Sequence, residues 1–353
     1  MVLYLWRYIV PEPQFYNTGH DPYMQCDTAL DDFVSLIWRE RYQEPGEFQL
    51  TIPATAEMLR YFTENTVMIT KSGTDTAMFA DRVVLKTSSD SGDYLTISGK
   101  SAEGLLQRRI VMDRDTVSGT AVDVVNKLID RNIGAVGYST ASGADARRYI
   151  NLLRHGNNAE ITSSVSIEPF GQNLGSLVSE TCKAVGCGFR VRHERGILYH
   201  ELYTGERRQV EFSPRFANIG DTEYTYDTSG YTTHVIVGGS GTGTGRAYGD
   251  AYNQNWRRYD GCGINARETY ENASGTTDSG LYAAAQLSML SKSVTQDCNV
   301  DVLPDGAFRY RRDYWLGDTV SVRNPYGITG VKTVSEVTET VDSAGRRVIP
   351  TLV

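Results

Sequence analysis

The chain has 353 residues, of which 40% are hydrophobic and 22% are charged. A chain of this length and composition can bury more than one core, so we expect roughly two to four compact units and exclude a disordered protein. The formal net charge of −8 argues against a broad nucleic-acid-binding surface, because phosphate recognition requires clustered Lys and Arg side chains.

The sequence predicts a protein that folds in a reducing compartment. Its five cysteines are odd in number and scattered, with no CxxC pair, which favours reduced and mostly buried thiols. The N-terminal segment lacks a basic leader and Arg7 interrupts its apolar run, so we expect no signal peptide. No stretch of about 18 apolar residues occurs, so we also expect no membrane span.

Residues 1–105 predict a first β domain. Apolar side chains alternate with period two from Leu3 to Ile9 and again from Phe33 to Arg39. Pro45-Gly46 then predicts a turn, in which we expect Gly46 to adopt a positive φ, and Phe48 to Ile52 forms the returning strand. Further strands are expected at 67–71, 76–86 and 94–99. We interpret the region as an antiparallel β-barrel.

Residues 106–207 change to an α+β pattern. Helical spacing of apolar residues after Ser118 predicts a helix that this serine caps and that Gly134 ends. A second helix is expected at 174–185, followed by a hairpin of strands 189–193 and 197–203 that turns at Arg195-Gly196.

The same order of helix and hairpin recurs at 239–311. A helix is expected at 281–294, and a hairpin of strands 299–303 and 307–311 follows it. Alternating patterns in 208–238 and 312–353 predict a second, discontinuous β-barrel domain, which the inserted segment interrupts. The predicted fold class is therefore a β-rich, multidomain α+β protein with two similar antiparallel β-barrel domains and inserted helix-plus-hairpin domains.

None of the sequence motifs that we considered for a catalytic, nucleotide-binding or metal-binding site is complete. The loop GGSGTGTG at 238–245 lacks both the dinucleotide-binding register and the Lys-Ser/Thr pair of a phosphate-binding loop. The five histidines do not pair at metal-ligand spacing, and a GxSxG element is absent. The pairs Asp31-Asp32 and Asp301 with Asp305 are better explained as solvated turn residues. We therefore predict no catalytic, cofactor-binding or metal-binding residues.

Two sequence elements do resemble a known family. The first is "SLIWRERYQEPGEFQLTIP" at 35–53, and the second is "DYLTISGKSAEGLLQRRIV" at 93–111. Both are similar to the opening of phage tail-tip hub proteins, the tail-associated (Tal) family, which resemble the baseplate hubs of contractile tails. The matching residues, predicted as a structural motif, are Trp38, Arg41, Tyr42, Gly46, Glu47, Phe48, Ser98, Gly99, Ser101, Leu105, Leu106 and Arg109. The closing segments 313–324 and 334–353 also resemble the final strands of that family.

The resemblance implies a structural virion protein at the tail tip. Members form homotrimers, and the two β-barrels of each subunit make a ring that continues a six-fold tail tube. DNA is expected to pass through the central channel without being bound sequence-specifically. The expected partners are a distal tail protein or tail tube protein, a tape-measure protein, and a fibre or spike protein. Assembly in the bacterial host cytoplasm and residence in the virion follow from this function. The charged residues of the 35–53 element are then available for ion pairs between protomers.

Two other functions stay open at this point. A cell-wall hydrolase or peptidase would need a nucleophile with a base, or zinc ligands, and the sequence shows neither set. A carbohydrate-binding receptor module is compatible with the 22 tyrosines and with Trp256.

Overall fold

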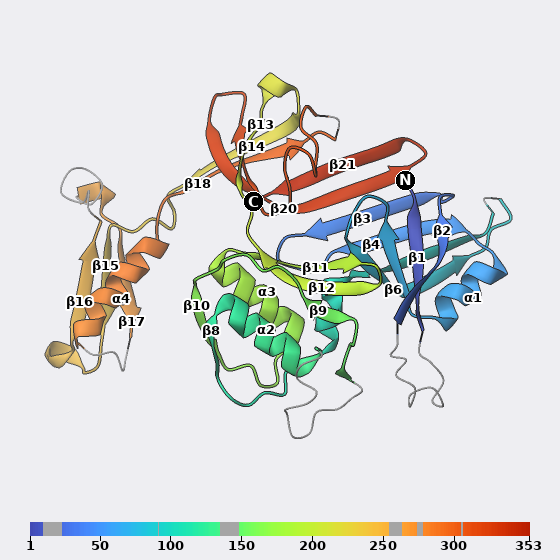
Figure 1. The fold of residues 1–353 in the computed structure, drawn as a ribbon. Helices are drawn as coiled ribbons and strands as arrows, with labels where there is room; N and C mark the ends of the chain where they lie inside the picture. Colours follow the sequence, from blue (N-terminus) through green and yellow to red (C-terminus); the bar gives the residue numbers. More distant parts are fainter. Residues whose placement is uncertain (10–22, 91, 135–147, 254–262, 274–277, 305) are drawn as a thin grey trace. The chain divides into compact units, whose positions relative to one another are not determined.

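The computed structural model comprises two compact units (Figure 1). Unit 1 contains Met1–Gly220, Val300–Arg323 and Val331–Val353, and unit 2 contains Asp221–Asn299 and Asn324–Gly330. The residues that the structure describes are 1–9, 23–90, 92–134, 148–253, 263–273, 278–304 and 306–353.

Unit 1 is built around an 11-stranded sheet with the order β13-β19-β20-β3-β4-β7-β6-β5-β1-β2, in which β21 also pairs with β20. Most neighbours are antiparallel, whereas β13 and β19 run parallel. The strands are β1 (Leu3–Ile9), β2 (Tyr23–Leu30), β3 (Ser35–Arg41), β4 (Glu47–Pro53), β5 (Val67–Lys71), β6 (Ala77–Lys86), β7 (Tyr94–Ser101), β13 (Arg207–Phe212), β19 (Thr319–Arg323), β20 (Thr329–Asp342) and β21 (Gly345–Leu352).

The period-two pattern of the sequence places one face of these strands in a core. Along β3, Leu36, Trp38 and Glu40 are buried while the residues between them are half-exposed, as a pleated strand requires. Helix α1 (Ala56–Glu64) adds Phe62 to the same core. Thr55 caps this helix by accepting a hydrogen bond from the Met58 amide at 3.1 Å, so a residue with good N-cap chemistry fixes where the helix begins.

The strand pairings correct the prediction of two β-barrels. They follow an open path from β13 to β2, and within the described residues no sheet closes on itself. Strand β20 explains the difference, because its residues 336–341 pair with β3 while 334–342 pair with β21. The C-terminal strands therefore extend the N-terminal sheet, and strands β13, β19, β20 and β21 of the second predicted β region share one sheet with the first.

An α+β part follows the first seven strands within unit 1. Helices α2 (Ala121–Asn132) and α3 (Leu174–Val185) lie side by side (Figure 1) and share an apolar core with the hairpin of β11 (Gly188–Glu194) and β12 (Ile197–Tyr203). The remaining elements are η2 (Ala102–Arg108), β8 (Val117–Thr120), β9 (Leu153–His155) and β10 (Ser164–Ile167).

The expected order of helix, helix and hairpin is found in this part. The hairpin turns at Arg195 and Gly196, whose φ angles are 51° and 86°, values that favour glycine at the second position. The predicted cap of α2 was wrong: Thr120, not Ser118, accepts the Asp123 amide at 3.2 Å. Ser118 instead lies in β8, which pairs with β10.

Unit 2 contains a three-stranded sheet covered by one helix. Strand β15 (His234–Gly238) is central, antiparallel to β16 (Tyr248–Tyr252) and parallel to β17 (Glu268–Asn272). Helix α4 (Asp278–Ser291) packs on it through Leu281 and Ala285. Strands β14 (Ile219–Asp227) and β18 (Thr295–Val302) form a separate two-stranded ribbon, and short helical turns occur at η4 (Pro214–Phe216), η5 (Gly243–Gly245) and η7 (Gly263–Asn265).

Two sequence predictions fail here. The segment 208–238 was placed in the second barrel, but its strand β15 pairs only with β16 and β17 among the described strands. The hairpin expected at 299–303 and 307–311 does not form either, because β18 pairs with β14, which is distant in sequence. Among the described residues, the β pairing of Tyr310 is an isolated bridge to Tyr314. Alternation of side chains predicts strands, but it carries no information on distant partners.

Candidate functional site

The motif residues of the two sequence elements meet where the β3–β4 hairpin lies against the end of β7 and the start of η2. Trp38 and Phe48 are register partners with ring centroids 6.2 Å apart, and both are buried. Two motif residues join the hairpin to β7, because the Gly46 amide donates to Ser101 Oγ at 2.8 Å and the Ser101 amide donates to the Gly46 carbonyl at 3.0 Å. Segments some fifty residues apart thus form one structural element.

Both motif glycines are required by close packing. We expected Gly46 to need a positive φ, and this was wrong, since Gly46 is not among the residues with that conformation. A Cβ atom at Gly46 would instead lie 2.2 Å from the Arg39 carbonyl oxygen. A Cβ at Gly99 would lie 1.8 Å from the Phe79 carbonyl oxygen, beside the irregularity between Ala80 and Arg82 of β6. Backbone approaches of this kind exclude any side chain.

The remaining motif residues lie around the same point. Tyr42 is buried, its ring meets Tyr203 edge-on with centroids 5.3 Å apart, and burial raises its pKa to about 12. Leu105 and Leu106 of η2 enter the core shared with α2 and α3. Ser98 pairs with Gln49 in the β4–β7 ladder. Arg109 follows η2, and burial and nearby arginines lower its pKa.

The charged residues of the 35–53 element have partners within the chain. Arg41 contacts Glu336 at 2.6 Å and Glu47 at 3.1 Å, and Arg39 also pairs with these two carboxylates. Lys183 pairs with Glu44 at 2.5 Å. These intrachain pairs occupy the charges that we expected to pair between protomers.

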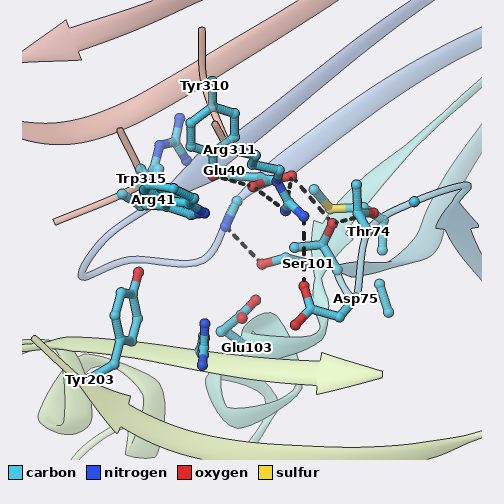
Figure 2. A pocket seen from close by; sticks show the side chains of 17 residues that line it. Glu40, Arg41, Thr74, Asp75, Ser101, Glu103, Tyr203, Tyr310, Arg311 and Trp315 are labelled. Atoms are coloured by element: carbon cyan, nitrogen blue, oxygen red, sulfur yellow. Dashed lines mark hydrogen bonds and ion pairs between the residues drawn. The ribbon is translucent and has the colours of Figure 1, made fainter. Parts of the chain in front are cut away.

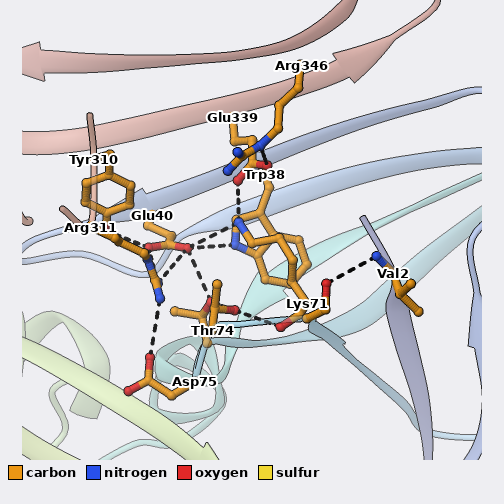
Figure 3. Close-up of polar contacts among 12 residues, drawn as sticks. Val2, Trp38, Glu40, Lys71, Thr74, Asp75, Tyr310, Arg311, Glu339 and Arg346 are labelled. Atoms are coloured by element: carbon orange, nitrogen blue, oxygen red, sulfur yellow. Dashed lines mark hydrogen bonds and ion pairs between the residues drawn. The ribbon is translucent and has the colours of Figure 1, made fainter. Parts of the chain in front are cut away.

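Glu40 is the centre of the site, although the motif comparison did not include it. Figure 3 shows it on β3, facing Arg311 from the C-terminal part of the chain. Arg311 Nη2 lies 3.0 Å from Glu40 Oε2, and the Tyr310 hydroxyl donates to the same oxygen at 2.8 Å. Trp38 Nε1 and Thr76 Oγ1 donate to Oε1 at 3.0 and 3.2 Å. Four donors fill the roughly four lone-pair sites of a carboxylate, so Glu40 is a structural acceptor with no lone pair left for a substrate.

A second buried ion pair extends the cluster to the last two strands. Lys71 Nζ lies 2.5 Å from Glu339 Oε2 and 3.8 Å from Glu40 Oε1, and it sits over the Trp38 ring at 5.0 Å from the centroid. Arg346 on β21 completes the row by contacting Glu339 at 2.6 Å. We call Glu40, Lys71, Arg311 and Glu339 the charge lock, since they join β3 and β5 to the C-terminal strands.

The electrostatics of the charge lock favour the ionised forms. Burial acts to raise the pKa of Glu40, but the positive charges of Arg311 and Lys71 outweigh it and lower the pKa. Burial likewise opposes ionisation of Glu339, and contacts with Arg346 and Lys71 lower its pKa. Arg311 has a φ of 64°, a left-handed conformation that costs a non-glycine residue about 1 kcal/mol or more. The surrounding contacts offset this strain.

A cavity of about 550 Å³ adjoins the charge lock. Figure 2 shows Glu103 and Tyr203 on its wall opposite Glu40. Burial raises the pKa of Glu103, whose Oε1 accepts the Val191 amide at 2.6 Å. The other lining residues come from the motif, from residues 73–78, from β11 and from residues 310–316, namely Arg41, Gly46, Gly73, Thr74, Asp75, Thr76, Ala77, Met78, Ser101, Arg190, Tyr310, Arg311, Trp315 and Leu316.

A separate polar cluster also escaped the sequence analysis. Asp130, His155 and His200 each offer one ligand atom, and these atoms all lie within 4.8 Å of one another. His155 and His200 are neighbours in the parallel β9–β12 pairing, a relationship that their sequence spacing does not reveal. In His200, burial lowers the imidazole pKa to about 3.

The fold is that of phage and prophage tail proteins. The 43 kDa tail protein of prophage MuSo2 from Shewanella oneidensis is 12% identical, with a TM-score of 0.54 over 100% of this chain and 98% of that one. Prophage tail protein gp18 from Listeria monocytogenes EGD-e is 12% identical, with a TM-score of 0.55 over 100% and 94%. The tail protein from Neisseria meningitidis MC58 is 13% identical, with a TM-score of 0.53 over 99% and 95%.

The sequence gives the more specific assignment. Residues 20–352 match the family described as Siphovirus ReqiPepy6 Gp37-like protein, and the chain therefore belongs to that family. It is a structural protein of the phage tail, and the resemblance to tail proteins is confirmed. No curated protein matches the sequence. Among the described residues, no helix is long and apolar enough to cross a bilayer.

Proposed function

We propose that the chain forms the homotrimeric hub at the tail tip or baseplate of a phage or prophage particle. In this function it adapts the six-fold tail tube to three-fold tip structures and closes or opens the channel through which DNA passes. The carrying observation is that the two terminal β regions form one sheet, joined by the pairing of β3 with β20. A subunit that presents two docking surfaces to a ring must hold these surfaces in a fixed position relative to each other.

The charge lock supports this proposal. It ties residues 40 and 71 of the first β region to Glu339 of the second and to Arg311, which directly precedes residues 312–353, and each of these side chains is at most 28% exposed. Buried ion pairs favour one arrangement over its alternatives, a use attested in some proteins. The twelve motif residues have the same purpose in our proposal, since they hold the hairpin, β7 and η2 together.

The proposed organisation keeps four parts. Residues 1–105 form the first tube-docking domain, and residues 106–207 form an α+β domain. The second tube-docking domain, predicted at 208–238 with 312–353, keeps the residues of that prediction that lie in unit 1, and the inserted α+β domain, predicted at 239–311, corresponds to unit 2. The proposed partners are two further copies of the chain, a distal tail or tail tube protein, the tape-measure protein, and a fibre or spike protein. The protein would assemble in the host cytoplasm and reside in the virion.

Co-expression with the distal tail and tube proteins tests the proposal. We expect a complex in which light scattering gives three copies of this chain for each ring. A stable complex with two or six copies would reject the trimeric hub. We also propose that the chain has no hydrolytic activity, and cleavage of peptidoglycan in a zymogram, abolished by one acidic, His or Cys substitution, would reject that.

A further inference from the structure

Three side chains with metal-ligand chemistry converge from three elements of unit 1. Asp130 lies in the last turn of α2, His155 ends β9, and His200 lies in the middle of β12. The parallel register places His155 opposite His200, with ring centroids 4.7 Å apart. Asp130 Oδ1 lies 2.7 Å from His155 Nε2. The backbone therefore brings two imidazoles and one carboxylate to one point.

His200 carries an unmet bonding requirement. The residue is 1% exposed, and its Nδ1 atom has no hydrogen-bond partner. Buried polar atoms are almost always paired, because leaving one unpaired is unfavourable. A bound cation would satisfy a ring nitrogen that has no protein partner.

We propose that Asp130, His155 and His200 bind one divalent transition-metal ion, with Zn²⁺ as the expected ion and water in the fourth position. Two imidazole nitrogens with one carboxylate oxygen form a donor set that suits zinc. Calcium and magnesium are disfavoured because they take oxygen ligands almost entirely. The proposal concerns a site apart from the charge lock and does not rest on the proposed hub function.

Formation of the site requires only small side-chain movements. Ligand atoms about 2.0–2.1 Å from a tetrahedral zinc lie roughly 3.3 Å apart, whereas the three candidate atoms lie within 4.8 Å. Asp130 and His155 are 21% and 42% exposed at the side chain, so both can rotate toward the buried His200. The metal would then link the end of α2 to the β9–β12 pair, which has only three register positions.

Metal titration of the full-length, tag-free protein tests this inference. After treatment with a chelator and dialysis, Zn²⁺ is titrated by calorimetry, and Co²⁺ binding is followed by its visible absorption. We expect one equivalent of Zn²⁺ for each chain, tetrahedral Co²⁺ bands, and a melting temperature that rises with added Zn²⁺. Absence of stoichiometric binding would overturn the proposal.

Variants distinguish this site from adventitious binding. His155→Ala and Asp130→Asn alter exposed or half-exposed side chains, and each should weaken Zn²⁺ binding by at least about tenfold. His234→Gln is the matched control, because His234 also lies near carboxylates, Asp250 and Glu268 at 3.0 and 3.1 Å, and it should bind Zn²⁺ like the unmodified chain. If His155→Ala binds Zn²⁺ with the same affinity as the unmodified chain, whether through cysteine thiols or other groups, the site is rejected. Circular dichroism of each variant verifies that it is folded.

Discussion

Unit 1 and unit 2 place their charges differently. In the charge lock of unit 1, the side chains of Glu40, Lys71 and Glu339 are 6–7% exposed. In unit 2, the carboxylates that face His234 and Lys292 are more open, with Glu268 at 65% and Glu271 at 40%. Exposed ion pairs contribute little, whereas removing one partner of a buried pair leaves an uncompensated charge. The difference predicts that removing one charge of the charge lock destabilises the protein more than removing one charge of these pairs in unit 2.

The largest effect is expected from Arg311→Ala. The substitution leaves Glu40 buried without its main cation, and breaking a buried pair in this way costs about 3–5 kcal/mol of the free energy of unfolding. Chemical denaturation measures the loss. The neighbouring Arg312 is 62% exposed, so Arg312→Ala is the control and should have a stability close to that of the unmodified chain. Similar values for the two variants would contradict the charge lock.

The second comparison concerns the space around two glycines, Gly46 in unit 1 and Gly230 in unit 2. In Gly46→Ala the new Cβ would lie 2.2 Å from the Arg39 carbonyl oxygen, whereas at Gly230 of unit 2 nothing lies within 4 Å. We expect Gly46→Ala to destabilise the protein by about 1–3 kcal/mol or more and to broaden or lower the melting transition of unit 1. Gly230→Ala should be close to neutral. If Gly46→Ala melts at the same temperature as the unmodified chain, Gly46 does not lie as close to the Arg39 carbonyl as described.

Acid should weaken unit 1 through the same carboxylates. The pKa values of Glu40 and Glu339 are lowered from the ordinary value of 4.5, so their stabilising contribution is present above about pH 4.5 and is lost as the pH falls toward the folded-state pKa. Denaturation between pH 6 and pH 3 should show a steep loss below about pH 4.5. Glu40→Gln should be less stable at pH 6 and should show a shallower loss in acid. If stability falls with pH as steeply in Glu40→Gln as in the unmodified chain, Glu40 does not contribute to the acid destabilisation.

The smallest effect is expected in unit 2. Glu271 contacts Lys292 and accepts from Ser288 Oγ at 2.6 Å, but it is 40% exposed. Glu271→Gln should therefore cost no more than about 1 kcal/mol, and moderate salt should reduce this cost further. A loss as large as that of Arg311→Ala would remove the distinction between the two units.

Local elements were predictable from the sequence, and their long-range partners were not. The helix at 174–185 and the turn at Arg195-Gly196 follow from apolar spacing and turn chemistry, which act over a few residues. The pairing of β3 with β20 joins segments some three hundred residues apart, and no local pattern encodes it. Gly46 was singled out correctly but for the wrong reason, because the atom that excludes a side chain belongs to Arg39.

The candidate site was predictable only in part. The resemblance to tail proteins selected Trp38, Gly46 and Ser101, which the structure brings together. It gave no sign of Arg311, which lies outside both motif elements, or of the convergence of His155 with His200. A buried Glu flanked by arginines reads in sequence as a solvated charged strand, since burial of a polar residue depends on partners supplied by the fold.

Cryo-electron microscopy of intact tails that carry this protein tests the central claim most directly. The account predicts three copies in a closed ring at the tail tip, with the two β regions of each subunit contacting successive positions of the six-fold tube. Six copies in that ring, or a position along the tail shaft, would contradict it.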